Sequence, residues 1–82
     1  MVHDFTLVYA LNPGVGSQDE VLRRLAGSGC ADATVGWGRP GHLALAFSRE
    51  ALSYDAAVAL AVTQIAQALP GASLVRTDVG LP

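Results

Sequence analysis

The pattern of hydrophobic and polar residues is most regular in the middle of the chain, over residues 30–47. Two apolar runs, 33–37 and 42–47, flank the turn sequence GRPG at 38–41. Glycine and proline at these positions favour a reversal of the chain, so this stretch is predicted to be a β-hairpin. Alternate residues of the returning strand are expected to face the core. They are Leu43, Leu45 and Phe47.

A strand and a helix are predicted before the hairpin. Residues 5–11, FTLVYAL, form a short apolar run rich in β-forming residues, which is typical of a central strand buried on both faces. Ser17 and Glu20 have the spacing of a capping box, in which each side chain accepts a hydrogen bond from a free backbone N–H. We expect the helix to end at residues 27–29, GSG. Its predicted apolar stripe is Val21, Leu22, Leu25 and Ala26.

A longer helix and a last strand are predicted after the hairpin. Ser53 is a good N-cap for a helix over residues 54–69, which stops at Pro70-Gly71, and residues 72–78 form the strand. The helical spacing predicts a core face of Tyr54, Val58, Ala61, Val62, Ile65 and Leu69. The outer face is uncharged beyond Asp55 and is expected to contain Ala56, Ala59, Leu60, Thr63, Gln64 and Gln67.

The element order β, α, β, β, α, β indicates a single ferredoxin-like α+β domain over residues 1–82. In this two-layer sandwich, a four-stranded antiparallel sheet carries both helices on one face, with the first and third strands in the centre. The other sheet face has no cover. Because its expected side chains are small and uncharged, we predict that a second copy of the chain covers it. The predicted interface residues are Thr6, Val8, Ala44 and Ala46 on the sheet, with Leu60 and Gln64 on the second helix.

The amino-acid composition also favours contact with another protein chain. Hydrophobic residues make up 51% of the chain and charged residues 15%, against a usual charged share of about 25%, so some apolar surface is expected to meet a partner protein. A net charge of −2, without lysine, gives this chain no electrostatic reason to bind nucleic acid. No signal peptide and no run of roughly 18 apolar residues is found, so we expect a cytoplasmic protein without a membrane partner.

Several segments resemble a family of small bacterial proteins, common in actinobacteria, that carry such a domain before a C-terminal helix-turn-helix. The similar segments are DFTLV at 4–8, GCADAT at 29–34, FSREA at 47–51, the helix start at Ser53, and Val75-Arg76. The resemblance implies a regulatory or assembly domain of DNA-binding proteins, some of them encoded near toxin–antitoxin genes.

This chain departs from that family at several positions. Ala31, Ala46 and Ser48 stand where the family usually has acidic residues, and the chain reaches Pro82 where the family continues into its helix-turn-helix. A face that is charged in the relatives is therefore smooth here, which favours a packed interface. The segment expected to touch DNA has no counterpart in these residues.

Candidate chemistry is sparse. Cys30 and Asp32, together with His3 or His42, are weak candidates for a reactive thiol, but a cysteine between a helix and a strand is more often a small buried hydrophobe. Residues 14–16, GVG, precede a helix as a phosphate loop would. We interpret them as an ordinary turn, because the rest of a nucleotide-binding motif is missing.

The hairpin tip is a candidate for recognition. Trp37 and Arg39 are residue types that anchor interfaces, and His42 is close to them in sequence. A structural role, with Trp37 covering the open end of the core, is an equal alternative. Two histidines without an acidic cluster at ligand spacing predict no metal site, and no cofactor is predicted.

The leading functional hypothesis is a non-enzymatic, homodimeric interaction module with a regulatory or assembly role, for which a second protein is a further candidate partner. Two alternatives remain. One is a small α+β-barrel dimer that binds or transforms a small molecule between sheet and helices, which leaves enzymatic activity open. The other is an antitoxin or immunity-like partner of a toxin that uses the uncharged helix face.

Overall fold

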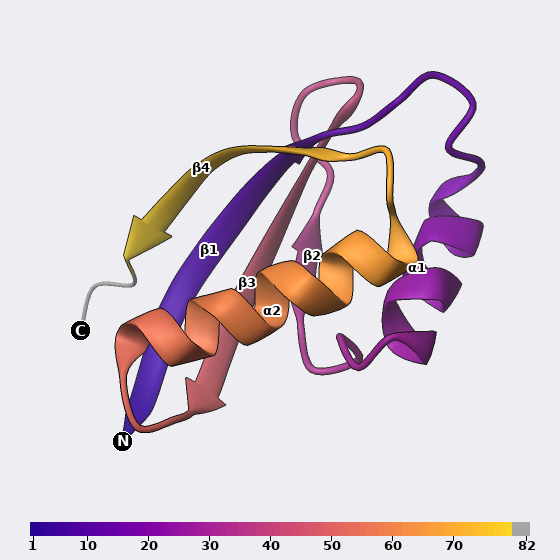
Figure 1. Cartoon of the computed structure of the whole chain (residues 1–82). Helices are drawn as coiled ribbons and strands as arrows, with labels where there is room; N and C mark the ends of the chain where they lie inside the picture. The colour runs from indigo at the N-terminus through magenta and orange to yellow at the C-terminus, as the bar shows by residue number, and fades with distance from the viewer. Residues whose placement is uncertain (80–82) are drawn as a thin grey trace.

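The computed structural model describes residues 1–79 and contains the six predicted elements in the predicted order (Figure 1). The elements are β1 (Val2–Ala10), α1 (Gln18–Gly27), β2 (Thr34–Gly36), β3 (His42–Glu50), α2 (Tyr54–Ala68) and β4 (Ser73–Val79). The ferredoxin-like βαββαβ fold is therefore confirmed.

The strands form one antiparallel sheet in the order β2-β3-β1-β4, so β1 and β3 are central, as predicted. The two central strands pair over their full length, from Val2 opposite Glu50 to Ala10 opposite His42. Backbone pairing, and not the apolar pattern, sets the ends of these strands. β1 therefore begins before the predicted Phe5, and β3 continues past the predicted Phe47. β2 is shorter than the predicted strand over 33–37, because only Thr34–Gly36 pair with β3.

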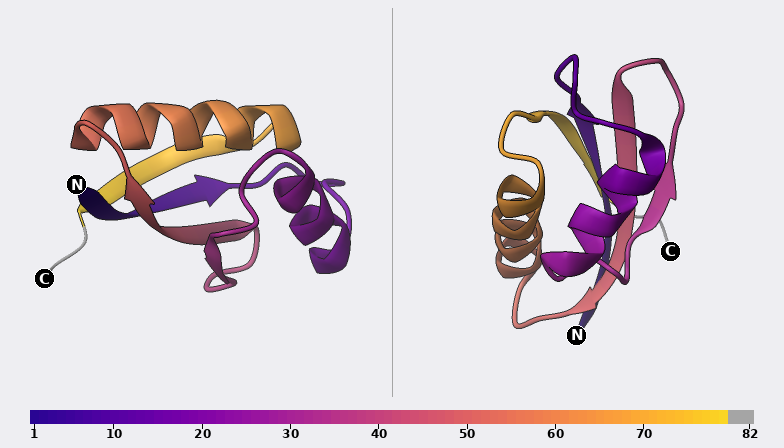
Figure 2. Two further views of the ribbon diagram at one scale, coloured as in Figure 1. Left: turned by 90° about the horizontal axis from the view of Figure 1, so that it is seen from below. Right: turned by 90° about the vertical axis from the view of Figure 1, so that its right-hand side faces the viewer.

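The core lies on the face of the sheet that the helices cover, and Figure 2 shows α2 running along that face. Alternate residues of β1 and β3 supply the sheet side of this core, since side chains alternate across a strand. Both helices supply the other side. The principal buried residues are Phe5, Leu7, Tyr9, Leu43, Leu45 and Phe47 on the strands and Val21, Leu25, Ala57, Ala61 and Ile65 on the helices.

The prediction that β1 is buried on both faces is wrong. Thr6, Val8 and Ala10 are only half-buried, because no helix covers their side of the sheet. The predicted stripe of α1 is narrower than expected: Val21 and Leu25 are buried, whereas Leu22 and Ala26 are exposed.

The core face of α2 is rotated from the predicted one. Ala57 and Ala68 are buried together with Ala61 and Ile65, whereas the predicted core residues Tyr54, Val58 and Val62 are half-buried. Alanines let a helix approach its neighbours closely, and α2 turns this small-residue side toward the core and α1. The larger valines are left at the flank.

Both predicted N-caps form. The Ser17 hydroxyl accepts from the Glu20 N–H at 3.2 Å, and the Ser53 hydroxyl accepts from the Ala56 N–H at 3.1 Å. The Glu20 carboxylate instead accepts from Arg24 at 2.7 Å, one turn along the helix. Within residues 1–79, neither helix has the length and apolar character needed to cross a bilayer.

Candidate functional site

The uncovered side of the sheet, which we call the open face, brings together most of the predicted interface residues. The strand register places Val8 beside Ala44 and Thr6 beside Ala46, and β2 continues these two rows with Gly36 and Thr34. On the side of β4, Arg76 continues the row of Val8 and Asp78 continues the row of Thr6. The centre of the open face is thus made of small, uncharged side chains, as predicted.

Basic side chains gather at one end of the open face. A shallow hollow of about 240 Å³ has Val8 and Ala44 in its lining, with Arg39, His42 and Arg76 around it. These residues come from the hairpin tip, the start of β3 and the middle of β4, which the antiparallel register brings to one end. This end therefore presents an apolar floor with a positive rim.

Acidic and hydroxyl side chains gather at the other end. A second hollow, of about 250 Å³, is lined there by Thr6 and Ala46 together with Asp4, Asp32 and Ser48. The Ser48 hydroxyl donates to the Asp4 carboxylate across the β1–β3 pair. The two ends of the open face consequently differ in side-chain chemistry, with arginines at one end and carboxylates at the other, and within the single chain Arg76 is paired with Asp78 and Asp32 with Arg49. The sequence pattern alone did not reveal this arrangement.

Arg49 fixes the acidic end. Its guanidinium donates through Nε and Nη2 to the two carboxylate oxygens of Asp32, both at 3.0 Å, and through Nη1 to the Gln64 side-chain oxygen at 2.7 Å. Nη2 also donates to the Gly29 carbonyl, and the group lies 4.4 Å from the centre of the Phe47 ring. One side chain thereby ties β3 to the loop before β2 and to α2.

This arrangement keeps Asp32 ionised. The hydrogen bonds from Arg49 lower the pKa of Asp32 below its ordinary value, and the positive charge adds to the effect. The role of Arg49 was missed at the sequence level. A single arginine in a strand resembles any solvated charge until the fold brings Asp32 and Gln64 to it.

Cys30 is a buried core residue. Its side chain is 3% exposed, and burial raises the pKa of the thiol, with smaller opposing effects from Ser28 and Arg49. His42 pairs with Ala10 at the other end of β3, and the His3 ring packs edge-on against Tyr54, with 6.3 Å between the ring centres. The grouping of Cys30 and Asp32 with His3 or His42 is therefore not assembled, and Asp32 is engaged by Arg49 instead.

The hairpin tip lies beside the loop that precedes α1. Trp37 is half-buried and packs against the core, whereas Arg39 is exposed. Together with His42 these residues line a hollow of about 320 Å³ whose opposite wall includes Val15 and Gln18. The three predicted tip residues thus surround one surface hollow.

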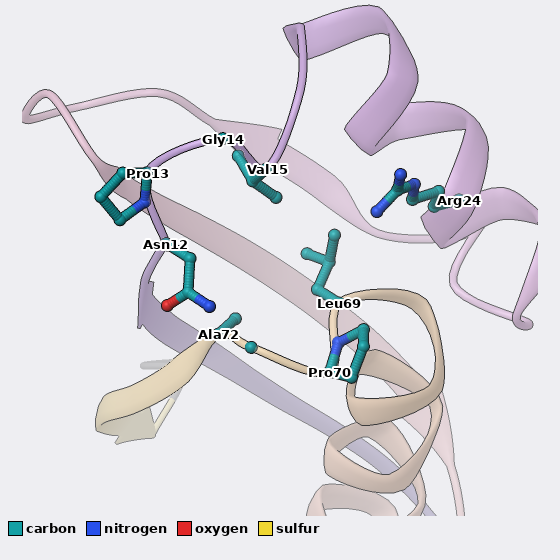
Figure 3. Close-up of a pocket in the computed structure, with 9 residues that line it drawn as sticks. Asn12, Pro13, Gly14, Val15, Arg24, Leu69, Pro70 and Ala72 are labelled. Carbon is teal, nitrogen blue, oxygen red and sulfur yellow. The ribbon is translucent and has the colours of Figure 1, made fainter.

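The loop between β1 and α1 borders a fourth hollow, of about 180 Å³ (Figure 3). Gly14 and Gly16 adopt positive φ angles of 85° and 110°, so they make the turn that the sequence predicted. Asn12 lies against Gly71, where a Cβ would be only 1.9 Å from its side-chain nitrogen. Arg24, which also lines the hollow, is paired with Glu20.

The two predicted interface residues on α2, Leu60 and Gln64, differ in exposure. Leu60 is 54% exposed on the outer side of α2, as expected. Gln64 is half-buried and accepts from Arg49, so its assignment to a free outer face is wrong. It sits on the flank of α2 that faces Gly29 and the end of α1.

Across the part of the chain that the structure describes, no three His, Cys, Asp or Glu side chains lie close enough together to hold a metal ion. Comparison with protein-family models, with curated proteins and with solved structures finds no match to this chain.

Proposed function

We propose that this protein is a non-enzymatic assembly module that docks a second copy of itself on the open face. The observation that carries the proposal is the small-residue centre between a basic and an acidic end. The segments that resemble the regulatory domain of bacterial helix-turn-helix proteins support a regulatory role for the assembly.

The charge pattern suits a two-fold symmetric contact. In such a contact both copies use the same patch, so each contact between one residue and a different residue of the other copy occurs twice. A two-fold axis that lies parallel to the sheet and crosses the strands at the middle of the open face brings the end with Arg39 and Arg76 of one copy toward the end with Asp4 and Asp32 of the other. The row of Val8 and Ala44 in one copy then meets the row of Thr6 and Ala46 in the other, where small side chains allow close approach of the two sheets.

The area of the open face limits the expected affinity between the two copies. With strands about 4.8 Å apart and a rise of about 3.3 Å per residue, the four strands project roughly 400 Å². A standard stable interface buries about 800 Å² on each partner. We therefore expect a dimer of modest affinity whose population depends on protein concentration.

The test is the solution mass of the wild-type chain and of Ala46→Asp, measured by light scattering over a dilution series. Ala46→Asp buries a carboxylate among the small side chains of the other copy, which costs free energy because the charge loses its hydration, so this variant is expected to show half the mass of the wild type. Ala59→Asp is the matched control, because it places the same charge on the exposed side of α2. A wild type that stays monomeric, or an Ala46→Asp variant with wild-type mass, contradicts the proposal.

The small-molecule alternative has less support. It needs space between the sheet and the helices, and the side chains that meet there, including Leu7, Leu45 and Ile65, are fully buried. The toxin-partner alternative would use the outer side of α2, where Leu60 is exposed. Leu60→Asp is expected to leave the mass of the dimer unchanged, which separates that surface from the open face.

A further inference from the structure

The edge strand β4 is exposed along its whole length. All of its residues, Ser73–Val79, are exposed, and within residues 1–79 it pairs with β1 alone. A free edge presents unpaired backbone N–H and C=O groups that pair readily with another strand. A register shift between Val8 and Tyr9 interrupts the β1–β4 ladder beside Val75, so the regular part of the free edge is residues 76–79.

The regular part of β4 is complementary to itself. Arg76 is paired with Val8 and Asp78 with Thr6, so both charges project from the open face of the sheet. They lie on either side of Thr77. If two β4 strands run antiparallel with Thr77 opposite Thr77, Arg76 of each strand lies opposite Asp78 of the other.

The geometry points to a second copy of this chain as the occupant of this edge: we propose that β4 pairs with β4 across a two-fold axis at Thr77. Two opposite-charge cross-strand pairs form in this register, and they replace the exposed pair that Arg76 makes with Asp78 in the single chain at 2.9 Å. Centring the pairing one residue earlier would place Arg76 opposite Arg76. The charges therefore select one register.

The helix side of β4 also lacks cover. Val79 is paired with Phe5 and Leu74 with Tyr9, so both point to the side of the helices, yet they remain 65% and 43% exposed. α2 packs on β1 and α1, and its half-buried Val58 and Val62 lie on the flank away from Gln64. Pairing of two β4 strands brings a second set of these apolar side chains alongside the first.

This contact is separate from the contact proposed for the open face. The axis at Thr77 runs perpendicular to the sheet, whereas the axis of a face-to-face dimer lies parallel to it. If both contacts form and the two perpendicular axes intersect, four chains close into one assembly. The β4 contact also adds buried area that the open face alone does not provide.

The test is a charge exchange in the 82-residue chain, with mass measured by light scattering. Arg76→Asp and Asp78→Arg each place like charges opposite one another, so each variant alone is expected to show half the wild-type mass. In an equimolar mixture every cross-strand pair is again opposite in charge, and the wild-type mass is expected to return. Circular dichroism and urea unfolding check that each variant is folded. Variants that keep the wild-type mass, or a mixture that does not recover it, overturn the inference.

Because Arg76 also borders the open face, the exchange is repeated with Ala46→Asp in every chain. The Ala46→Asp protein is then expected to be a dimer through β4, the two charge variants monomers, and their mixture a dimer. If Ala46→Asp alone is already a monomer, the β4 contact is overturned and the open-face contact stands. If the mixture recovers a dimer and Ala46→Asp does not change the wild-type mass, the β4 contact stands and the open-face contact fails.

Discussion

The two faces of the sheet use the same strands in opposite ways. On the covered face β1 and β3 contribute Phe5, Leu7, Leu45 and other large side chains, which are almost completely buried. On the open face the same strands contribute Thr6, Val8, Ala44 and Ala46, which are small and half-buried. Large side chains fill the space under two helices, whereas small ones leave a flat surface that another sheet can approach.

This difference separates stability from assembly. Changes on the covered face are expected to alter the free energy of unfolding of the single chain, whereas changes on the open face are expected to alter the association of chains. The predictions below test that separation, beginning with the largest effect.

Leu45→Ala is expected to lower the free energy of unfolding by about 2–5 kcal/mol, because it leaves a cavity at a fully buried position. The measurement is urea unfolding at a concentration where the chain is monomeric. Val8→Ala on the open face serves as the comparison and is expected to cost about 1 kcal/mol or less. Equal costs at the two positions would remove the distinction between the faces.

Arg49→Ala is expected to cost about 1–3 kcal/mol, because Arg49 is mostly buried and its loss leaves Asp32 without its donor and Gln64 with only the long contact from the Cys30 thiol. Arg49→Lys keeps the charge and is expected to recover only part of the loss, since an ammonium cannot bridge both Asp32 oxygens. An Arg49→Ala chain with wild-type stability in urea would show that the cluster is only a solvated contact.

The same cluster predicts a pH dependence. Since Arg49 lowers the pKa of Asp32, folding favours the carboxylate. This contribution is complete above the ordinary pKa of 3.8 and is lost as the pH falls through the lower value of the folded state. Unfolding curves between pH 6 and 2 are therefore expected to show a smaller acid-induced loss in Arg49→Ala than in the wild type.

Tyr9→Phe is expected to change the free energy of unfolding by about 1 kcal/mol or less, and in the stabilising direction. The Tyr9 hydroxyl is buried, and no group among residues 1–79 forms a hydrogen bond with it. Removing such a hydroxyl relieves its desolvation without losing a bond. A loss of more than about 1 kcal/mol in urea would mean that the hydroxyl has a partner.

Burial also raises the pKa of Tyr9 and of Cys30 above their ordinary values of 10.0 and 9.0. Folding therefore favours the protonated groups, and this contribution is complete below the ordinary values and lost as the pH rises through the raised ones. Stability is expected to fall in alkali, and to fall less in the Cys30→Ala, Tyr9→Phe double variant. Parallel alkaline unfolding curves for the two proteins would contradict this.

The sequence predicted the fold well because its elements have strong local signals. Ser17 and Ser53 cap the helices as predicted, and the alternation of Leu43, Leu45 and Phe47 identified the covered face. Periodicity alone did not fix the rotation of α2. Packing against β1 and α1 decided it, and placed Ala57 in the core while leaving Val62 at the flank.

The candidate site was predicted only in part. The small residues of the open face follow from alternation along β1 and β3. The charge separation does not, because it depends on the register that brings Arg76 beside Val8 and on the hairpin tip that brings Arg39 there. Gln64 was misplaced for a similar reason, since its partner Arg49 lies fifteen residues earlier, on a different element.

The most direct test of the open face is site-specific cross-linking. In a Cys30→Ala background, Ala46→Cys places the only thiol in the centre of the open face, and packed sheets lie about 10 Å apart. A bis-maleimide of about that span is expected to link two chains efficiently through residue 46, and Ala59→Cys, on the exposed side of α2, is expected to stay unlinked under the same conditions. Equal linking at the two positions, or none at residue 46 in a protein that is dimeric in solution, would contradict the docking of a second copy on the open face.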